Sequence, residues 1–467
     1  MMGIQIVILW SDLLIWLLVA AGIGVGLLIA RDPPLLSAWR RVGANRVGMA
    51  SATVLLAFIV IGLLDSLHYR VALEGKPGQK VQYAIEVLSL LDAVATPLRT
   101  RSEKTYSEPF ATRLYAKETI DVPGRGSVRD YPRLKHGGQH LGEREKEVAA
   151  DASFTAFRAG VLAFLGWLAV AGMASAVVGR DDSTAASGWQ KIWRGETAFA
   201  WNAVLLTLGL MLLVAVPLFW LSGQYHVFGT DKVGQDVLYQ ILKSVRTGLI
   251  IGLVTTLVML PVAVLLGIVA GYFRGWVDDV IQYLYTVLNS IPGVLLIAAA
   301  VLMMQVVIDT HPQWFSTAAE RADLRLRALC FILGITSWTG LCRLLRGETL
   351  KLRELEYIQA AQAFGVSNWR IIVRHILPNL MHIVIIALVM DFSGLVLAEA
   401  VLSYVGIGVD PSMTSFGTMI NNARMELGRE PVVWWSLAAA FAAMFILVLA
   451  ANLFADAVRD AFDPRAA

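Results

Sequence analysis

Long apolar stretches, separated by charged segments, run along most of the chain. They lie near residues 4–30, 46–64, 155–178, 199–222, 248–271, 280–308, 327–345, 380–405 and 433–455. Each is long enough to cross a hydrocarbon layer about 30 Å thick as an α-helix. Backbone polar groups find no water in lipid, so these stretches are expected to be helices rather than open strands. The pattern predicts an all-α integral membrane protein, a polytopic bundle of about nine transmembrane helices.

The composition supports a membrane protein and argues against several other classes. Hydrophobic residues make up 57% of the chain and charged residues only 16%, whereas soluble domains carry about 25% charged residues. The net charge of +3 gives no reason to expect a nucleic-acid partner. Cys330 and Cys342 lie about 18 Å apart along a helix and cannot pair with each other. Neither the cysteines nor the histidines show metal-ligand spacing, so we expect no metal.

Basic residues in short loops orient the chain, because such loops stay in the cytoplasm. The loop after the first stretch holds Arg31, Arg40, Arg41 and Arg46 against Asp32, and 343–378 is also rich in arginine. Nine spans satisfy both loops if the N-terminus lies outside and the C-terminus inside. Residues 65–154 then form a partly irregular external domain, with turn signals at Lys76-Pro77-Gly78 and Val122-Pro123-Gly124.

The segment Leu355–Pro378 is the most informative cytoplasmic part of the chain. Four residues at helical spacing form a stripe of small and aromatic side chains, namely Tyr357, Ala360, Ala361 and Phe364. Gly365 is expected to end this helix, and Ser367 to cap a second one. The second stripe consists of Trp369, Ile372, Val373 and Ile376. Pro378 ends the second helix or opens the next span.

Two short amphipathic helices joined at a glycine predict a docking element. Ala360 and Ala361 let a partner surface approach closely, while Tyr357 and Phe364 can fill a pocket in that surface. The alternative is that both helices cover the membrane surface or the end of the bundle itself.

Here the sequence resembles a known family. The segments Tyr357–Gly365 and Arg374–Asn379 are similar to the "EAA…G…LP" loop of permease subunits of binding-protein-dependent ABC importers. Within that family they look like the C-type subunit of the dipeptide and oligopeptide branch, with Gln359 in place of the motif's glutamate and His375 in place of an isoleucine. Four further segments match in family order: Gly229–Asp236, Gly271–Asp278, Leu397–Val409 and Arg459–Arg465. The resemblance covers about 220–467, with a weaker match at 39–64.

The resemblance implies a transporter subunit without enzymatic activity of its own, which forms half of a translocation path for peptides or similar small solutes. Its implied partners are a homologous permease subunit, two ATP-binding-cassette ATPase subunits and an external solute-binding protein, in the bacterial cytoplasmic (inner) membrane. The residues expected to couple to the ATPase are Tyr357, Gln359, Ala360, Ala361, Phe364, Gly365, Trp369 and Pro378. The chain has no phosphate-loop motif, so we expect no cofactor in it, with ATP-Mg bound by the partner subunits.

The resemblance also divides the chain into four predicted parts. Residues 1–64 hold an extra anchor and a family-like first span, and 65–154 form an external inserted domain. Residues 155–222 form an inserted pair of spans. The permease core is 223–467, with its coupling loop at 346–379.

Ionisable residues inside spans are costly and often functional. Asp391 and Glu399 fall within 380–405 and are candidates for the translocation path. For Glu399 the pattern favours a structural hydrogen bond, whereas Asp391 can equally meet a cationic group of the substrate or pair with another helix. A further candidate, the outer-side motif, consists of Gly229, Thr230, Asp231, Gly234 and Asp236. It can contact a substrate-delivery protein, although its two aspartates are more typical of residues that cap and orient the following helix.

Other function classes stay open. One is a membrane-embedded sensor or enzyme that uses the external domain, and another is an importer of a non-peptide solute such as nickel or an opine. The docking element favours a transporter subunit, because a sensor or an enzyme has no need of it. A secondary transporter is disfavoured by the lack of an inverted repeat and by the few charged residues in the spans.

The orientation is testable by labelling. We expect a reporter fused after Ala467 to lie in the cytoplasm, and a cysteine placed near Arg125 to react with an impermeant reagent from outside. Labelling of residues 355–378 from outside in intact cells would overturn this orientation.

Overall fold

The computed structural model describes residues 4–73, 82–122, 126–142, 144–179, 185–315 and 317–462. The turn signal at Lys76-Pro77-Gly78, the labelling position Arg125 and the end of the last family segment, Asp463–Arg465, lie outside the described residues. Within these ranges, nine helical segments are long and apolar enough to cross a membrane. The predicted all-α, multi-pass fold is therefore confirmed. The chain divides into two compact units, described in turn below.

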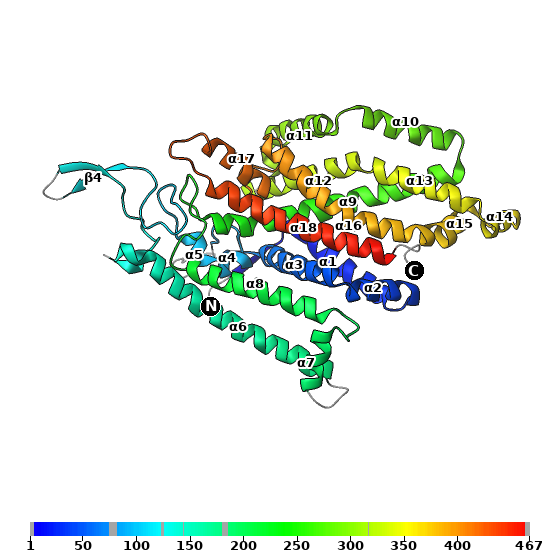
Figure 1. The fold of residues 1–467 in the computed structure, drawn as a ribbon. Coiled ribbons are helices and arrows are strands. Elements are labelled where there is room, and N and C mark those ends of the chain that lie inside the picture. The colour runs from blue at the N-terminus through cyan, green and yellow to red at the C-terminus, as the bar shows by residue number, and fades with distance from the viewer. Residues whose placement is uncertain are drawn as a thin grey trace. The chain divides into compact units, whose positions relative to one another are not determined.

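The first unit comprises Met1–Ile8, Ile29–Thr247 and Thr414–Phe454. Its long helices are α3 (Arg46–Asp65), α6 (Val148–Val178), α8 (Trp201–Ser222), the first part of α9 (Val237–Phe273) and most of α18 (Trp435–Phe462). Helices α6 and α8 pack side by side, with α7 (Ala185–Arg194) between them in the chain, and α3 packs on α8 (Figure 1). The shorter helices are α2 (Pro33–Ala44), α4 (Leu90–Val94), α5 (Thr96–Thr100), α17 (Phe416–Glu426), η1 (Gln139–Leu141) and η2 (Glu145–Glu147).

Two small antiparallel sheets belong to the same unit. One has the order β1 (Ile4–Val7), β2 (His68–Val71) and β3 (Leu88–Ser89), and the other is a hairpin of β4 (Glu118–Val122) and β5 (Gly126–Asp130). Ile4 pairs with Val71 and Val7 with His68. The prediction that the first span starts at residue 4 was therefore wrong, because these four residues extend along β2 and the helix begins only at Trp10.

The second unit comprises Leu9–Leu28, Gly248–Met413 and Ala455–Ala467. It contains α1 (Trp10–Ile29), most of α9 and the last part of α18, together with the following elements: α10 (Trp276–Ser290), α11 (Gly293–Thr310), η4 (Pro312–Trp314), α12 (Ala318–Ser337), α13 (Thr339–Arg353), α14 (Glu356–Ala363), α15 (Asn368–Ile371), η5 (Ile372–Ile376) and α16 (Leu377–Tyr404). One apolar core joins α9, α10, α13, α14, η5 and α16, and its fully buried members include Ile358, Ile371 and Ile376.

The prediction of one continuous span at 280–308 was wrong. The chain forms α10 and α11, with a break at Ile291 and Pro292. Proline has no N–H group for the helix and pushes the residue before it out of the helical region. Ile291 accordingly adopts an extended conformation, with φ −94° and ψ 132°. Of these two helices, only α11 is long and apolar enough to cross a membrane.

The compact units do not follow the predicted boundaries at 64, 154 and 222, and the four-part division stays a prediction. Residues 103–107, which the sequence assigned to a separate external part, bond directly to the outer-side motif. The Ser107 amide donates to the Thr230 hydroxyl at 2.7 Å, and this hydroxyl donates to the Thr105 carbonyl oxygen at 2.9 Å. The Glu103 amide donates to the Gly234 carbonyl oxygen at 2.9 Å. Residues 103–107 thus form part of the structure at the start of α9.

A buried charged group strengthens this junction. The His226 side chain is only 5% exposed and lies between two carboxylates, 2.7 Å from Asp236 Oδ2 and 3.4 Å from Glu103 Oε1. Burial lowers the pKa of His226, but hydrogen bonds to both carboxylates raise it to about 9. Burial raises the pKa of Glu103, but bonds from His226 and from three backbone amides lower it to about 2. At neutral pH a protonated His226 therefore donates to both carboxylates.

This junction predicts a pH dependence. His226 stabilises the fold fully below pH 6.5, its ordinary pKa, and this contribution is lost as the pH rises through about 9. Glu103 contributes above its ordinary pKa of 4.5, and its contribution is lost as the pH falls toward 2. We therefore expect the thermal unfolding midpoint of the full-length protein to fall between pH 6.5 and 9.

The matched variants are His226→Gln and His140→Gln. His140 is more exposed and pairs with Asp151 in the same unit. His226→Gln is expected to flatten the alkaline slope, while His140→Gln keeps it. An unchanged slope in His226→Gln would show that the junction does not titrate as described.

Candidate functional site

The predicted coupling loop folds as two short helices in front of a span. Helix α14 contains Tyr357, Ala360 and Ala361 of the first stripe, and Phe364 is its C-cap residue, which confirms the predicted helix there. Helix α15 has a single turn and continues into η5, a π-helical segment that leads directly into α16 (Figure 1). Pro378 lies in the first turn of α16, so it opens the span rather than ending the second helix.

Gly365 ends α14 as predicted. Its φ of +75° lies in the left-handed region, which costs other residues about 1–2 kcal/mol. The Gly365 amide donates to the Gln362 carbonyl oxygen at 3.0 Å, and the Val366 amide donates to that of Ala361 at 3.1 Å. These two bonds form a Schellman motif, which closes the helix end and turns the chain toward α15.

Tyr272, at the end of α9, fixes both helices. Its hydroxyl donates to Asn368 Oδ1 in α15 at 3.0 Å and accepts from Gln362 Nε2 in α14 at 3.3 Å. The Arg353 guanidinium at the end of α13 donates to the Tyr272 carbonyl oxygen at 2.7 Å. Tyr272 is 3% exposed. One buried tyrosine thus connects α9, α13, α14 and α15, although its segment was noted in the sequence only as a family match.

Ion pairs hold the neighbouring helix ends. Arg346 of α13 makes a bidentate pair with Asp278 of α10, with N···O distances of 2.5 and 2.7 Å. Arg274, after α9, pairs with Glu354, after α13. Bidentate pairs fix geometry more firmly than single contacts, so the helices that carry the loop are held at its base.

Gln359 stands where the family motif has a glutamate, and its local contacts explain this difference. Its side-chain amide donates to the Glu354 carbonyl oxygen at 3.2 Å and to Glu354 Oε2 at 3.4 Å. A glutamate at 359 would bring a second carboxylate against Glu354 instead of a donor. The amide therefore suits this position.

The loop has a buried side and an exposed side. Ile358, Ile371 and Ile376 are fully buried. By contrast, the Phe364 side chain is 87% exposed, and Ala360, four residues before it, is exposed as well. An aromatic residue this exposed on a fixed turn has no packing role within its own chain. The buried side covers the end of the chain's own bundle, which is part of what the alternative expected, while the exposed side leaves a face that suits a partner.

Other predictions for the loop need correction. The second stripe does not form one face, because Ile372 and Ile376 are buried while Trp369 and Val373 are exposed. The wider π-helical turn at 372–376 changes the phase of the side chains relative to an α-helix. Trp369 and Val373 line an apolar groove of about 230 Å³ against α9. Ser367 occupies the N-cap position, but its side chain makes no capping hydrogen bond.

Two more members of the first stripe touch their own chain. Ala361 is half-buried against the core. The Tyr357 hydroxyl accepts a hydrogen bond from Asn379 Nδ2 at 3.2 Å, and its ring lies 6.0 Å from that of His375. Tyr357 is 46% exposed, so it braces the start of α16 and also keeps one side open.

The two acidic residues of α16 differ in their surroundings. Glu399 is 1% exposed, and its Oε1 accepts from the Ser403 hydroxyl at 2.6 Å. This is the structural hydrogen bond that the sequence favoured. Asp391 is half-buried and makes no hydrogen bond or ion pair within the described ranges.

The outer-side motif is mostly enclosed. Thr230 and Asp236 are at most 1% exposed, and Asp236 Oδ1 accepts from the Leu238 amide at 2.8 Å at the start of α9. Asp231 Oδ1 accepts from the amides of Val233 and Gln235 at 2.9 and 2.8 Å. Asp236 thus caps the start of the helix, whereas Asp231 orders the turn before it and accepts from Gln240 Nε2 of the helix at 2.7 Å. Gly229 and Gly234 have φ of +70° and +75°, and each lies against other parts of the chain.

Comparisons with known proteins find similar transport proteins. A family model described as "Binding-protein-dependent transport system inner membrane component" matches residues 263–467. The chain is 31% identical over 324 residues to the glutathione transport system permease protein of Pectobacterium atrosepticum, covering 64% of this chain and 98% of that relative.

Two other relatives are similar at the same level. The dipeptide transport system permease protein of Lactococcus lactis is 31% identical over 241 residues, covering 52% of this chain and 64% of the relative. The oligopeptide transport system permease protein of Mycobacterium bovis is 31% identical over 242 residues, covering 52% of this chain and 77% of the relative.

The turn at Gly365 can be tested with a matched pair of alanine variants. The position of an added Cβ is open at both Gly365 and Gly347, but only Gly365 has a positive φ. Gly365→Ala is expected to destabilise the turn by about 1–2 kcal/mol, and Gly347→Ala to stabilise α13 by roughly 0.5–1 kcal/mol. Hydrogen exchange of residues 361–368 measures the difference. Equal exchange in both variants would mean that the turn does not depend on the left-handed residue.

Proposed function

Because the chain belongs to the family of binding-protein-dependent inner-membrane transport permeases, in its peptide-importer branch, we propose that its exposed loop face docks on an ATPase carried by a separate chain. The observation that carries the proposal is the 87% exposed Phe364 on a turn whose other side is fixed in the core. Aromatic residues in such positions often supply most of the binding energy of an interface. The loop then lies in the cytoplasm, as the basic short loops indicate.

The proposed complex has this chain, a homologous permease subunit, two ATP-binding-cassette ATPases that bind ATP-Mg, and an external solute-binding protein. Each permease supplies half of the translocation path. Helices α14 and α15 are connected to α9 through the hydrogen bonds of Tyr272, and to α16 through η5. A displacement of the docking face therefore moves two spans together, which is what coupling of ATP hydrolysis to transport needs.

Peptides are the proposed substrate class. The relatives are named for glutathione, dipeptide and oligopeptide transport, and these solutes share an amino group and a carboxylate. Asp391 is an acid within a span, where an uncompensated carboxylate is costly. We assign it to the path, where it meets the cationic group of the solute.

The proposal is tested with Phe364→Ala and the matched control Trp434→Ala, in which an exposed aromatic residue next to α18 is removed. Loss of a central aromatic anchor costs about 2 kcal/mol or more, which is about thirtyfold in affinity. Phe364→Ala is expected to lower ATPase co-purification and solute uptake in vesicles by about that factor, while Trp434→Ala leaves both unchanged.

Ala360→Glu tests the same face independently, since it buries an unpaired charge against the partner. If Phe364→Ala and Ala360→Glu both keep normal ATPase association and uptake, the loop is a passive pair of surface helices.

A further inference from the structure

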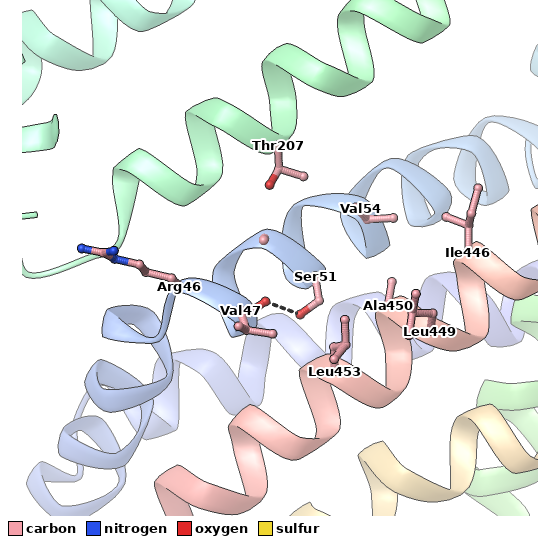
Figure 2. A pocket seen from close by; sticks show the side chains of 10 residues that line it. Arg46, Val47, Ser51, Val54, Thr207, Ile446, Leu449, Ala450 and Leu453 are labelled. Atoms are coloured by element: carbon pink, nitrogen blue, oxygen red, sulfur yellow. Dashed lines mark hydrogen bonds between the residues drawn. The ribbon is translucent and has the colours of Figure 1, made fainter.

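An apolar groove of about 350 Å³ lies between α3, α8 and α18 in the first unit (Figure 2). Its volume falls in the range of about 300–1,000 Å³ that is typical of small-molecule sites. All three helices are long and apolar enough to cross a membrane. The groove is lined among others by Val47, Ala50 and Val54 of α3, Thr207 of α8, and Leu449 and Leu453 of α18.

The groove offers little to a polar ligand. The Ser51 hydroxyl, which also lines it, is bonded within its own helix. It lies 2.9 Å from the Val47 carbonyl oxygen (Figure 2) and 3.0 Å from that of Gly48. An open apolar groove between spans offers few hydrogen-bond partners to a polar solute and suits a hydrocarbon chain. Along α3 the lining runs from residue 46 to residue 54, about 12 Å of helix.

One end of the groove carries a positive charge without a partner. Arg46, the first residue of α3, is exposed and makes no hydrogen bond or ion pair within the described ranges. Figure 2 shows its side chain at the end of the groove, pointing away from the apolar lining. Its guanidinium lies next to Gly195, in the loop between α7 and α8. A Cβ atom added to this glycine would be 3.3 Å from the Arg46 Nη2 atom.

Two segments meet at this end of the groove and are rich in cations. One is the chain between α1 and α3, and the other is the loop between α7 and α8. The Ala200 amide donates to the Gly43 carbonyl oxygen at 2.8 Å, which joins the start of α8 to the end of α2. The described residues of these loops and of the adjoining α2 and α7 carry more cations than acids, namely Arg31, Arg40, Arg41, Arg46, Lys191 and Arg194 against Asp32 and Glu196.

Helix α7 marks the same end as a membrane surface. Ile192 is fully buried against Ala171 and Leu205, while Trp189 and Trp193 are partly exposed, with ring centroids 5.7 Å apart. Tryptophan and basic residues on a short amphipathic helix are typical of the headgroup level of a membrane.

We propose that this groove binds an acyl chain of an anionic phospholipid whose phosphate is held by Arg46. The charge selects the occupant, because a basic group at the headgroup level next to an apolar trough between spans matches a lipid with a negative headgroup. The bound lipid fills the space between α3, α8 and α18 and joins the inserted pair of spans to α18. In the proposed orientation it belongs to the cytoplasmic leaflet.

The test uses the full-length protein, delipidated in detergent and incubated with vesicles of equal parts phosphatidylglycerol and phosphatidylcholine. After repurification, the bound lipid is quantified by mass spectrometry. Wild type is expected to retain more phosphatidylglycerol than phosphatidylcholine, and Arg46→Gln to reduce that preference about fivefold, the size expected for one arginine near an anionic surface. Ala50→Phe, which fills the groove, is expected to reduce retention of both lipids.

Two variants serve as controls. Arg31→Gln removes a basic residue of the same loop that does not line the groove, and Leu56→Phe adds bulk on the exposed face of α3. Both are expected to behave as wild type. Equal retention of the two lipids by wild type, an unchanged preference in Arg46→Gln, or full retention by Ala50→Phe would each overturn the proposal.

Discussion

The hydroxyl group of Tyr272 joins the end of α9 to both short helices of the coupling loop, and the rest of the functional account depends on this joint. A docking face can transmit force only if it cannot move independently of the spans. Tyr272 meets this condition with one donated and one accepted hydrogen bond, at 3.0 and 3.3 Å, in a site that is 3% exposed. The Schellman turn at Gly365 then sets the direction of α15 relative to α14.

Residues 103–107 fix the start of α9, as Tyr272 fixes its end. The sequence predicts that 65–154 form an external inserted domain. Instead, Glu103, Thr105 and Ser107 bond to the motif around Thr230, and His226 lies between two carboxylates at the start of α9. Buried charges of this kind are stable only when each is paired. Residues 103–107 therefore contribute to the structure of a motif that the sequence assigned to the permease core alone.

The sequence was sufficient to predict those features of the fold that depend on the length of apolar stretches or on a single residue such as glycine. The multi-pass helical fold, the helix that carries Tyr357, Ala360 and Ala361, and the stop at Gly365 follow from composition, spacing and backbone freedom. The break before Pro292 was missed because the stretch was judged by hydrophobic length, although Asn289, Ser290 and the Pro292-Gly293 pair are turn-forming residues. The split of Trp369 and Val373 from Ile372 and Ile376 was missed because the stripe assumed an α-helical period, whereas the chain forms a π-helical segment. The roles of Tyr272 and His226 depend on long-range partners, which no local pattern contains.

The central claim, that the face around Phe364 contacts the ATPase, has a direct measurement. Cys330 and Cys342 are both fully buried, so Phe364→Cys introduces one accessible thiol among the described residues. The measurement is the rate at which a water-soluble maleimide labels this thiol, with and without the ATPase subunits. The account predicts rapid labelling of the isolated permease and strong protection in the complex. Equal labelling rates in the two states would contradict it.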